Sequence, residues 1–318
     1  MLTKEENEVL TRVGSETPMG QLMRQHWTPV CLIEEVDTPD GKPILVEALA
    51  ERFVAFRDTD GRLGLLDELC PHRRASLVLG RNEECGLRCL YHGWKFDVDG
   101  NVLAMSSEPE GSPLKEKLKH KSYPVREAGG FVWAWLGDAD AVPEFDLPAF
   151  APTEDTQIAI LKINVPCNWA QITEGQIDSA HSSSLHSTDM VPARIEGASA
   201  GSTAWYRPST DKSPRMQIQT MSYGFRYAAI RRPIKNAATS NYIRVTQYVA
   251  PYTSLIPPNS SYNVASVIVP ATDESTSFYF IAWGGVACPS TAEWRKFNHA
   301  VPGIDLDEEW RPWRSIDN

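Results

Sequence analysis

Two cysteine–histidine pairs carry the clearest chemistry in this sequence of 318 residues. Cys70 lies two residues before His72, and Cys89 lies three residues before His92. Two thiolates on one iron and two imidazoles on the other are the ligands of a Rieske [2Fe–2S] cluster. Because neutral imidazoles replace two anionic thiolates, such a cluster has a higher reduction potential than an all-cysteine centre. The pattern therefore predicts a site that accepts single electrons and passes them on.

Two other uses of these residues are open. Structural zinc also takes two cysteines and two histidines, but zinc sites usually keep the cysteines together and the histidines together. A disulfide between Cys70 and Cys89 would suit an exported protein. The sequence begins with a polar segment after Met1 and shows no apolar export segment, so we favour the iron–sulfur cluster.

The composition is that of a globular protein with room for two domains. Apolar residues make up 42% and charged residues 23% of the chain. The formal net charge of −10 argues against nucleic acid or an anionic membrane as the partner, and no apolar run has the length of a membrane span. The remaining cysteines form no compact framework, so we expect a reducing cytoplasm. The cysteines expected to pack as small core residues are Cys31, Cys85, Cys167 and Cys288.

Short strands separated by turns dominate the first half of the chain. Thr17, followed by a proline, suits the N-terminus of a short helix. His120 lies between two lysines and is expected to be solvated. The expected strands cover residues 44–50, 53–57, 63–67 and 129–137, with a hairpin at Asp99 and Gly100. Residues 28–147 are therefore predicted to form a small all-β domain, with a linker over residues 143–152.

The second half has longer strands and more aromatic residues. The expected strands cover residues 158–165, 203–206, 216–226, 241–252, 261–269 and 276–284. Such a pattern with few helices is typical of an antiparallel sheet. The whole chain is accordingly predicted to be an α+β protein.

A second group of candidate metal ligands follows the linker. Four residues at spacings of three, four and three share one helical face: Gln171, Glu174, Asp178 and His181. His186 comes five residues after His181, about 140° around an ideal helix. Both imidazoles can reach one ion only if the helix is interrupted, which Ser182–Ser184 permits. Two histidines five residues apart are by themselves more often coincidental, but two histidines and a carboxylate also hold iron in non-haem Fe(II) oxygenases.

The residues around both groups resemble a known family. The segments 70–77 and 89–96 are similar to the cluster loops of Rieske non-haem iron ring-hydroxylating oxygenases, and His92-Gly93-Trp94 is a specific signature of these loops. Many members have glycine where this chain has Arg74, and the arginine resembles the phthalate-dioxygenase branch. The spacing of Asp178, His181 and His186 matches the family's iron motif. The resemblance implies a helix-grip (START-like) catalytic domain with an antiparallel sheet over residues 1–27 and 148–318.

The resemblance also implies roles for the second group. His181 and His186 would hold a mononuclear Fe2+, and Asp178 would bridge to the cluster histidine of a neighbouring subunit that corresponds to His92. Electrons would then cross between chains of a homo-oligomer, a trimer or stacked trimers. From its spacing alone, Asp178 suits a carboxylate that accepts an imidazole N–H from His181, and the alternative is that it only caps the helix break.

One part of the family's iron site cannot be assigned. The third ligand in the family is an aspartate on a late C-terminal helix, and we expect it beyond residue 318. The acidic residues near this end of the sequence are Asp305, Asp307, Glu308, Glu309 and Asp317.

The resemblance further implies the substrate class. Phthalate is a dianion, and arginine is suited to bind carboxylates because its planar fork stays charged. Arg207 and Arg244 lie on expected strands and are candidates, although a single arginine on a strand usually points to solvent. Arg231 and Arg232, in tandem before a proline, are typical of a solvated loop.

The expected activity is that of a terminal oxygenase. It would receive NADH-derived electrons from a flavin- or ferredoxin-type reductase and use O2 for cis-dihydroxylation of phthalate at the 4,5 positions. Three alternatives stay open: a Rieske monooxygenase or demethylase, a dioxygenase for isophthalate, terephthalate or a chlorobenzoate, and a Rieske electron carrier. The carrier would leave His181 and His186 without a use.

Overall fold

The computed structural model describes residues 2–109, 111–185, 209–257 and 261–313. The chain divides into two compact units, Met1–Pro148 with Val269–Asp273, and Ala149–Ile268 with Glu274–Asn318. Residues 1–27 belong to the first unit, whereas the sequence placed them with the catalytic domain. Arg24 links this segment to the sheet of the first unit, since its guanidinium donates to the Leu49 carbonyl (2.7 Å) and to the Glu51 carboxylate (3.0 Å).

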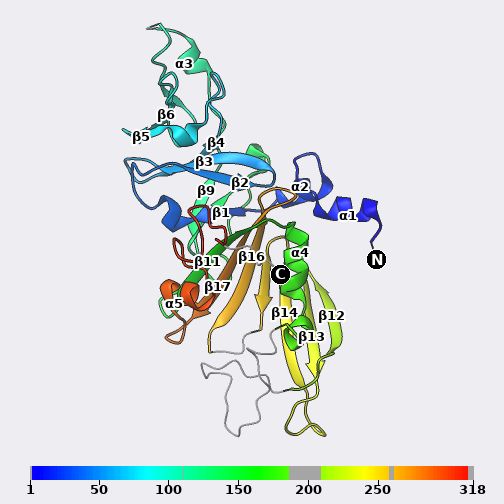
Figure 1. Ribbon diagram of the computed structural model, residues 1–318. Helices are drawn as coiled ribbons and strands as arrows, with labels where there is room; N and C mark the ends of the chain where they lie inside the picture. The colour runs from blue at the N-terminus through cyan, green and yellow to red at the C-terminus, as the bar shows by residue number, and fades with distance from the viewer. Residues whose placement is uncertain (1, 110, 186–208, 258–260, 314–318) are drawn as a thin grey trace. The chain divides into compact units, whose positions relative to one another are not determined.

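The first unit is built from three antiparallel sheets. They comprise β1 (Thr28–Leu32), β10 (Phe131–Ala134) and β9 (Val125–Ala128); β2 (Ile44–Ala48), β3 (Glu51–Arg57) and β4 (Leu63–Asp67); and β5 (Arg81–Glu83), β6 (Gly86–Arg88), β7 (Lys95–Phe96) and β8 (Val102–Ala104). Short helices connect them: α1 (Lys4–Thr11), α2 (Pro18–Met23), α3 (Leu114–Lys117), η1 (Ile33–Val36), η2 (Leu77–Leu79) and η3 (Ala139–Ala141). Figure 1 shows β5 and β6 beyond the sheet of β2, β3 and β4.

Local sequence signals set several of these elements. Thr17 caps α2, since its hydroxyl accepts the Gly20 N–H. The hairpin between β7 and β8 is confirmed, with Gly100 at a φ of 80° that suits glycine. The Asp97 carboxylate closes this turn by accepting the N–H groups of Asp99 and Asn101. Three antiparallel sheets with only short helices between them make up residues 28–147, as predicted.

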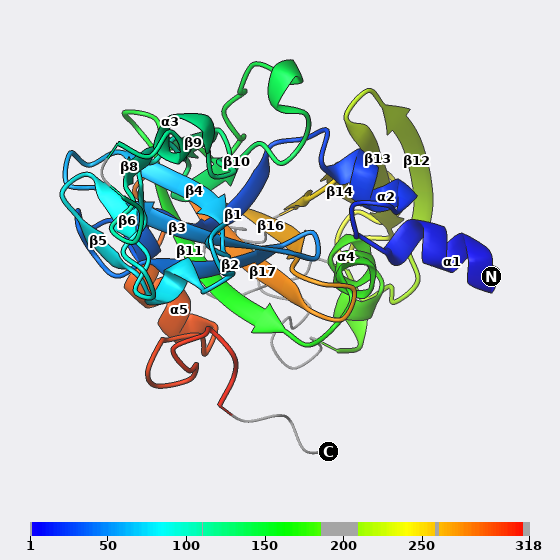
Figure 2. The ribbon, with the colours of Figure 1, turned by 90° about the horizontal axis from the view of Figure 1, so that it is seen from above.

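The second unit is one seven-stranded antiparallel sheet with helices packed against it. Its strand order is β11 (Gln157–Val165), β17 (Thr276–Gly284), β16 (Asn263–Pro270), β15 (Thr253–Ile256), β14 (Tyr242–Val249), β13 (Gly224–Arg231) and β12 (Arg215–Met221). Helix α4 (Trp169–Ile177) packs on β14 and β15, and α5 (Thr291–Phe297) packs on β11 (Figures 1 and 2). A short 3-10 helix, η4 (His181–Ser183), follows α4.

Two strand predictions for this unit were wrong and one falls outside the described residues. The stretch 216–226 was predicted as one strand, but it turns back at Ser222 and Tyr223, so that Met221 pairs with Gly224. That two-residue turn has neither Asn-Gly nor Asp-Gly, the usual signals of a hairpin. Strand β15 was missed, and the expected strand 203–206 lies outside the described residues. Within the described ranges, each helix is too short or too polar to cross a bilayer.

Candidate functional site

The two cluster loops have the same backbone design. In each loop the cysteine N–H donates to the carbonyl five residues later, and the cysteine carbonyl accepts the N–H four residues later. The partners are Ala75 (2.9 Å) and Arg74 (2.8 Å) for Cys70, and Trp94 (2.7 Å) and Gly93 (3.0 Å) for Cys89. The fourth residue after the cysteine has a positive φ in both loops, 58° at Arg74 and 71° at Gly93. The two turns thus share one backbone pattern, although His72 comes two residues after its cysteine and His92 three residues after its cysteine.

The four predicted cluster ligands come together between these turns. The rings of His72 and His92 lie 4.5 Å apart, centre to centre. The thiols of Cys70 and Cys89 are buried among core residues of β3, β6 and β7 and interact directly with each other. The indole of Trp94 stacks on His72 at 4.6 Å with an angle of 5° between the rings.

The chemistry of these groups fits a two-iron cluster. Nδ1 of His72 is buried without a hydrogen-bond partner, which a metal ion would supply. Burial, together with the neighbouring Cys89 sulfur, raises the pKa of the Cys70 thiol to about 11, so its thiolate needs a bound cation. No three histidine, cysteine or acidic side chains among the described residues converge on one ion. The two thiols meet each other and the two imidazoles meet each other, an arrangement that suits one iron held by thiolates and a second held by imidazoles.

The second loop is held by groups that sequence reasoning missed. The Arg88 guanidinium donates to the Gly93 carbonyl (3.1 Å) and to the Glu83 carboxylate (2.6 Å). This hydrogen bond from Arg88 is the main reason why the pKa of Glu83 is lowered. The Trp94 indole N–H donates to the Ser107 hydroxyl (2.9 Å). Arg88 directly precedes Cys89, and that adjacency is the one signal in the sequence that could have found it.

Substitution of Gly93 by alanine should loosen the cluster, whereas Arg74→Gly should not. A β-carbon at Gly93 would lie 2.8 Å from the Ser106 hydroxyl oxygen and 3.1 Å from its β-carbon, and the positive φ adds strain. We expect a loss of about 2 kcal/mol, from backbone strain of 1–2 kcal/mol plus crowding. Thermal bleaching of the cluster's visible absorption measures it. Equal bleaching temperatures for Gly93→Ala and Arg74→Gly would contradict this expectation.

The second group of ligands lies at the C-terminal end of α4. The helix ends at Ile177, and Asp178 is already extended, with ψ at 119°. His181 therefore lies in η4, and the prediction that it shares a helical face with Gln171 is wrong. The helix breaks earlier than Ser182 because the Asp178 carboxylate accepts the N–H groups of Ala180 and His181, both at 2.8 Å, in place of helical bonds.

Asp178 and His181 form a close pair. Oδ2 of Asp178 lies 3.2 Å from Nδ1 of His181, within reach of an imidazole N–H. Burial opposes ionisation of Asp178, but the two backbone N–H groups and the His181 imidazole together hold its pKa below the usual value. The carboxylate thus both caps the chain break and contacts the imidazole. An imidazole that donates from Nδ1 leaves Nε2 available to a metal.

Of the other predicted residues of this site, the structure places only Arg244. His186 and Arg207 lie outside the described residues. Arg244 is half-buried on β14, where its guanidinium donates to the Pro257 carbonyl (2.5 Å). The positive charge of Arg244 acts on Tyr227 and opposes the rise of its pKa. The Tyr227 hydroxyl in turn donates to the Ile177 carbonyl at the end of α4. Arg244 therefore lies in the neighbourhood of Asp178.

Two of the acidic residues considered for the third iron ligand, Asp305 and Asp307, accept backbone hydrogen bonds within local turns. Asp305 accepts the Val301 N–H (2.9 Å), and Asp307 accepts the N–H of Glu309 (2.9 Å) and of Arg311 (2.8 Å). These bonds hold the loop after α5. The carboxylate that completes the iron site stays unassigned among the described residues.

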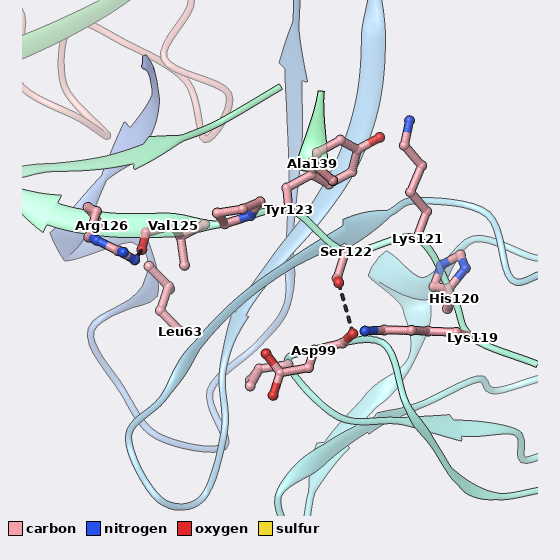
Figure 3. A pocket seen from close by; sticks show the side chains of 12 residues that line it. Leu63, Asp99, Lys119, His120, Lys121, Ser122, Tyr123, Val125, Arg126 and Ala139 are labelled. Atoms are coloured by element: carbon pink, nitrogen blue, oxygen red, sulfur yellow. Dashed lines mark hydrogen bonds between the residues drawn. The ribbon is translucent and has the colours of Figure 1, made fainter. Parts of the chain in front are cut away.

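A cavity of about 680 Å³ opens in the first unit, and its lining includes none of the four cluster ligands (Figure 3). Basic side chains line it, among them Lys119, Lys121 and Arg126. His120 was predicted to be solvated, but it is 5% exposed and its Nε2 lies 2.8 Å from the Asp67 carbonyl. Successive side chains of this extended segment point in opposite directions. Lys119 and Lys121 therefore face solvent, and His120 faces inward against Phe96.

Acid should destabilise the first unit through His120. Burial lowers the pKa of His120, although the Asp67 carbonyl and carboxylate oppose this. The pKa of His120 is lower in the folded protein than in the unfolded chain. Its contribution to the stability of the first unit is therefore complete above about pH 6.5 and is lost as pH falls through the pKa of the folded protein.

A glutamine at position 120 can keep the hydrogen bond without titrating. We therefore expect His120→Gln to reduce the fall in cluster bleaching temperature between pH 7.5 and 5.5. His299→Asn, at an exposed histidine, is the control. A fall as steep as that of the unchanged protein would argue against His120 as the titrating group.

Comparison with known families agrees with both units. Residues 26–124 match the Rieske [2Fe-2S] domain, and residues 134–318 match the family described as LigXa C-terminal domain like. Among solved structures, a Pseudomonas putida CBB5 NdmA variant with caffeine covers 87% of this chain and 78% of its own, with a TM-score of 0.65 and 21% identity. That likeness confirms the predicted fold, an all-β Rieske domain joined to an antiparallel-sheet domain.

Curated relatives match over nearly the whole chain. The phthalate 4,5-dioxygenase oxygenase subunit of Pseudomonas putida is 61% identical over 319 positions, covering 100% of this chain and 73% of the relative. The 3-chlorobenzoate-3,4-dioxygenase oxygenase subunit of Comamonas testosteroni is 33% identical, covering 96% and 69%. With these matches and the cysteine–histidine loops in place, the chain belongs to the Rieske oxygenases, a family of enzymes that use a [2Fe–2S] cluster and a mononuclear iron.

Proposed function

We propose that this protein is the terminal oxygenase of a phthalate 4,5-dioxygenase system. The observation that carries the proposal is the 61% identity to the phthalate 4,5-dioxygenase oxygenase subunit along the whole chain. The product would be the cis-4,5-dihydrodiol of phthalate, with NADH as the source of electrons through a separate reductase. When bound, the two metal groups supply single-electron transfer and dioxygen activation.

The residues of the first unit would hold the cluster and shield it. Cys70 and Cys89 are almost fully buried, while His72 and His92 are partly exposed. Burial, with the neighbouring His72 and the charge of Arg73, lowers the pKa of His92 and favours the neutral imidazole that binds metal. Electrons would therefore enter and leave on the histidine side.

The residues after α4 would hold the mononuclear iron. His181, with His186, would be its imidazole ligands, and Asp178 fixes the His181 ring by accepting from Nδ1. Asp178 is partly exposed, with 42% of its side chain accessible, which leaves room for a neighbouring subunit to contact it. This supports a homo-oligomer, a trimer or stacked trimers, in which Asp178 meets a cluster histidine of the next chain.

Arg244 would anchor the substrate. The Pro257 carbonyl orients its guanidinium, and its charge lies near the end of α4 that carries the iron-site residues. A planar guanidinium binds a carboxylate through two parallel N–H groups. Arg207 is the candidate for the second carboxylate of phthalate.

Product analysis with labelled oxygen tests the activity. The purified oxygenase, supplied with a reductase of the family, NADH and phthalate, should consume O2 and yield a dihydrodiol that carries both atoms of one 18O2. A phenol that carries one labelled atom would identify a monooxygenase instead, and formaldehyde released from a methoxylated aromatic acid offered in place of phthalate would identify a demethylase. An electron carrier would contain two irons per chain, whereas an oxygenase contains three.

A chlorinated benzoate is the second candidate substrate, because the 3-chlorobenzoate-3,4-dioxygenase subunit also matches along 96% of this chain. Phthalate, isophthalate, terephthalate and 3-chlorobenzoate should be compared by kcat/KM at equal oxygen. A dianion-binding site predicts that phthalate exceeds the monoanion 3-chlorobenzoate. The reverse order would reassign the substrate and keep the reaction class.

A further inference from the structure

Strand β13 holds the backbone on both sides of Asp178. Tyr227 and Arg231 lie four residues apart on β13 and so point to the same face of the sheet. The Tyr227 hydroxyl donates to the Ile177 carbonyl. The Arg231 guanidinium donates to the Ser179 carbonyl at 2.7 Å. The two carbonyls that flank Asp178 are therefore both bound by one strand of the sheet.

The Arg231 side chain is itself fixed from two directions. Only 2% of Arg231 is exposed, so the expectation that it lies in a solvated loop is wrong. Its Nε donates to the Asp211 carbonyl (3.2 Å), and a further nitrogen donates to the Ser179 hydroxyl (3.3 Å). Burying a guanidinium costs hydration free energy, which a rigid set of hydrogen bonds offsets only when the geometry is good. An arginine in this position keeps Ser179 in one place.

Tyr227 completes the same support from the helix side. The last carbonyls of an α-helix have no partners within the helix, and Tyr227 supplies one for Ile177. Burial raises the pKa of Tyr227, a hydrogen bond with Thr246 lowers it, and the Asp178 charge raises it. The phenol therefore stays protonated as a donor, and it lies within electrostatic reach of Asp178.

We propose that Tyr227 and Arg231 are positioning residues that hold the Asp178–His181 pair in register for the mononuclear iron. The carboxylate and the imidazole are 3.2 Å apart only while residues 177–181 keep their turn, and β13 fixes both ends of the Asp178 peptide unit. The inference rests on the proposed function in one respect, since it takes His181 as an iron ligand. It adds two residues that act through the backbone of Ile177 and Ser179.

Fe2+ titration of the protein depleted of its mononuclear iron tests the proposal, with the visible spectrum of the retained cluster as the check that the first unit is intact. Arg231→Gln should weaken Fe2+ binding roughly tenfold, the lower end of the effects seen when a residue that supports a metal ligand is replaced. Tyr227→Phe, which loses a single neutral hydrogen bond, should weaken it roughly fivefold. Both should lower kcat and leave KM for phthalate unchanged, because both side chains bind backbone carbonyls beside Asp178. Arg231→Lys keeps a charged donor, so its Fe2+ affinity should lie between that of the unchanged protein and that of Arg231→Gln.

Arg232→Gln is the matched control, because the neighbouring arginine is 73% exposed at its side chain. Wild-type Fe2+ affinity in both Arg231→Gln and Tyr227→Phe, with the cluster present, would overturn the proposal. If Arg231→Gln fails to fold, Tyr227→Phe decides alone, since it removes a single oxygen atom. If the unchanged protein binds Fe2+ but does not oxidise phthalate, the substrate assignment fails. The Fe2+ affinities of the variants then still test whether Tyr227 and Arg231 position the Asp178–His181 pair.

Discussion

Replacement of Asp178 by asparagine is expected to lower the rate of NADH-driven phthalate oxidation at least about 100-fold. This is the upper end of the effects seen when the hydrogen-bond partner of a metal-binding histidine is replaced. The Oδ2 atom accepts the His181 N–H at 2.8 Å and lies 3.2 Å from Nδ1 of the same residue. An amide nitrogen at that position can accept neither, so the His181 ring loses the partner that fixes its tautomer. The negative charge beside the imidazole is lost as well.

The Asp178 experiment needs to separate electron transfer from folding. The cluster spectrum and the thermal bleaching temperature should stay as in the unchanged protein, while reoxidation of the reduced cluster by substrate and O2 in a single turnover should become slow. Glu174→Gln, at an exposed carboxylate on the same helix, is the control and should be neutral. A fast single turnover in Asp178→Asn would remove Asp178 from the path between the two metal centres.

The cluster site was predictable from sequence because its geometry is local. Each cysteine–histidine pair lies within one turn, and the turn is closed by hydrogen bonds that span four and five residues. Ligand types and short spacings therefore contain most of the information. An arginine does not by itself predict the left-handed conformation that Arg74 adopts. The conformation is understood by comparison with Gly93, which has the same place and a similar φ in the other loop.

Residues whose roles depend on distant partners were predicted less well. Arg231 and His120 were both judged by polar neighbours in sequence, yet Arg231 binds Ser179, 52 residues away, and His120 binds Asp67, 53 residues away. The end of α4 was missed for a different reason. An aspartate can cap a chain break as well as continue a helical pattern, and the spacing to His181 suits both.

Substitution of Arg244 by glutamine should raise KM for phthalate about 10- to 100-fold, which corresponds to the loss of one charged hydrogen-bonded contact of about 1.5–3 kcal/mol. The side chain is half-buried on β14 and oriented by the Pro257 carbonyl. Glutamine retains a donor but not the charge or the planar fork. Lysine retains the charge alone, so Arg244→Lys should recover only part of the affinity.

Selectivity separates a substrate contact from a structural effect of Arg244. If Arg244 binds one of two carboxylates, Arg244→Gln should shrink the preference for phthalate over benzoate, because benzoate has one carboxylate fewer. Fe2+ affinity and the cluster spectrum should not change. Arg226→Gln, at an exposed arginine of the adjacent strand β13, is the control. Unchanged phthalate kinetics in both Arg244→Gln and Arg207→Gln would mean that the carboxylates of the substrate are bound elsewhere, and the phthalate assignment would lose its chemical basis.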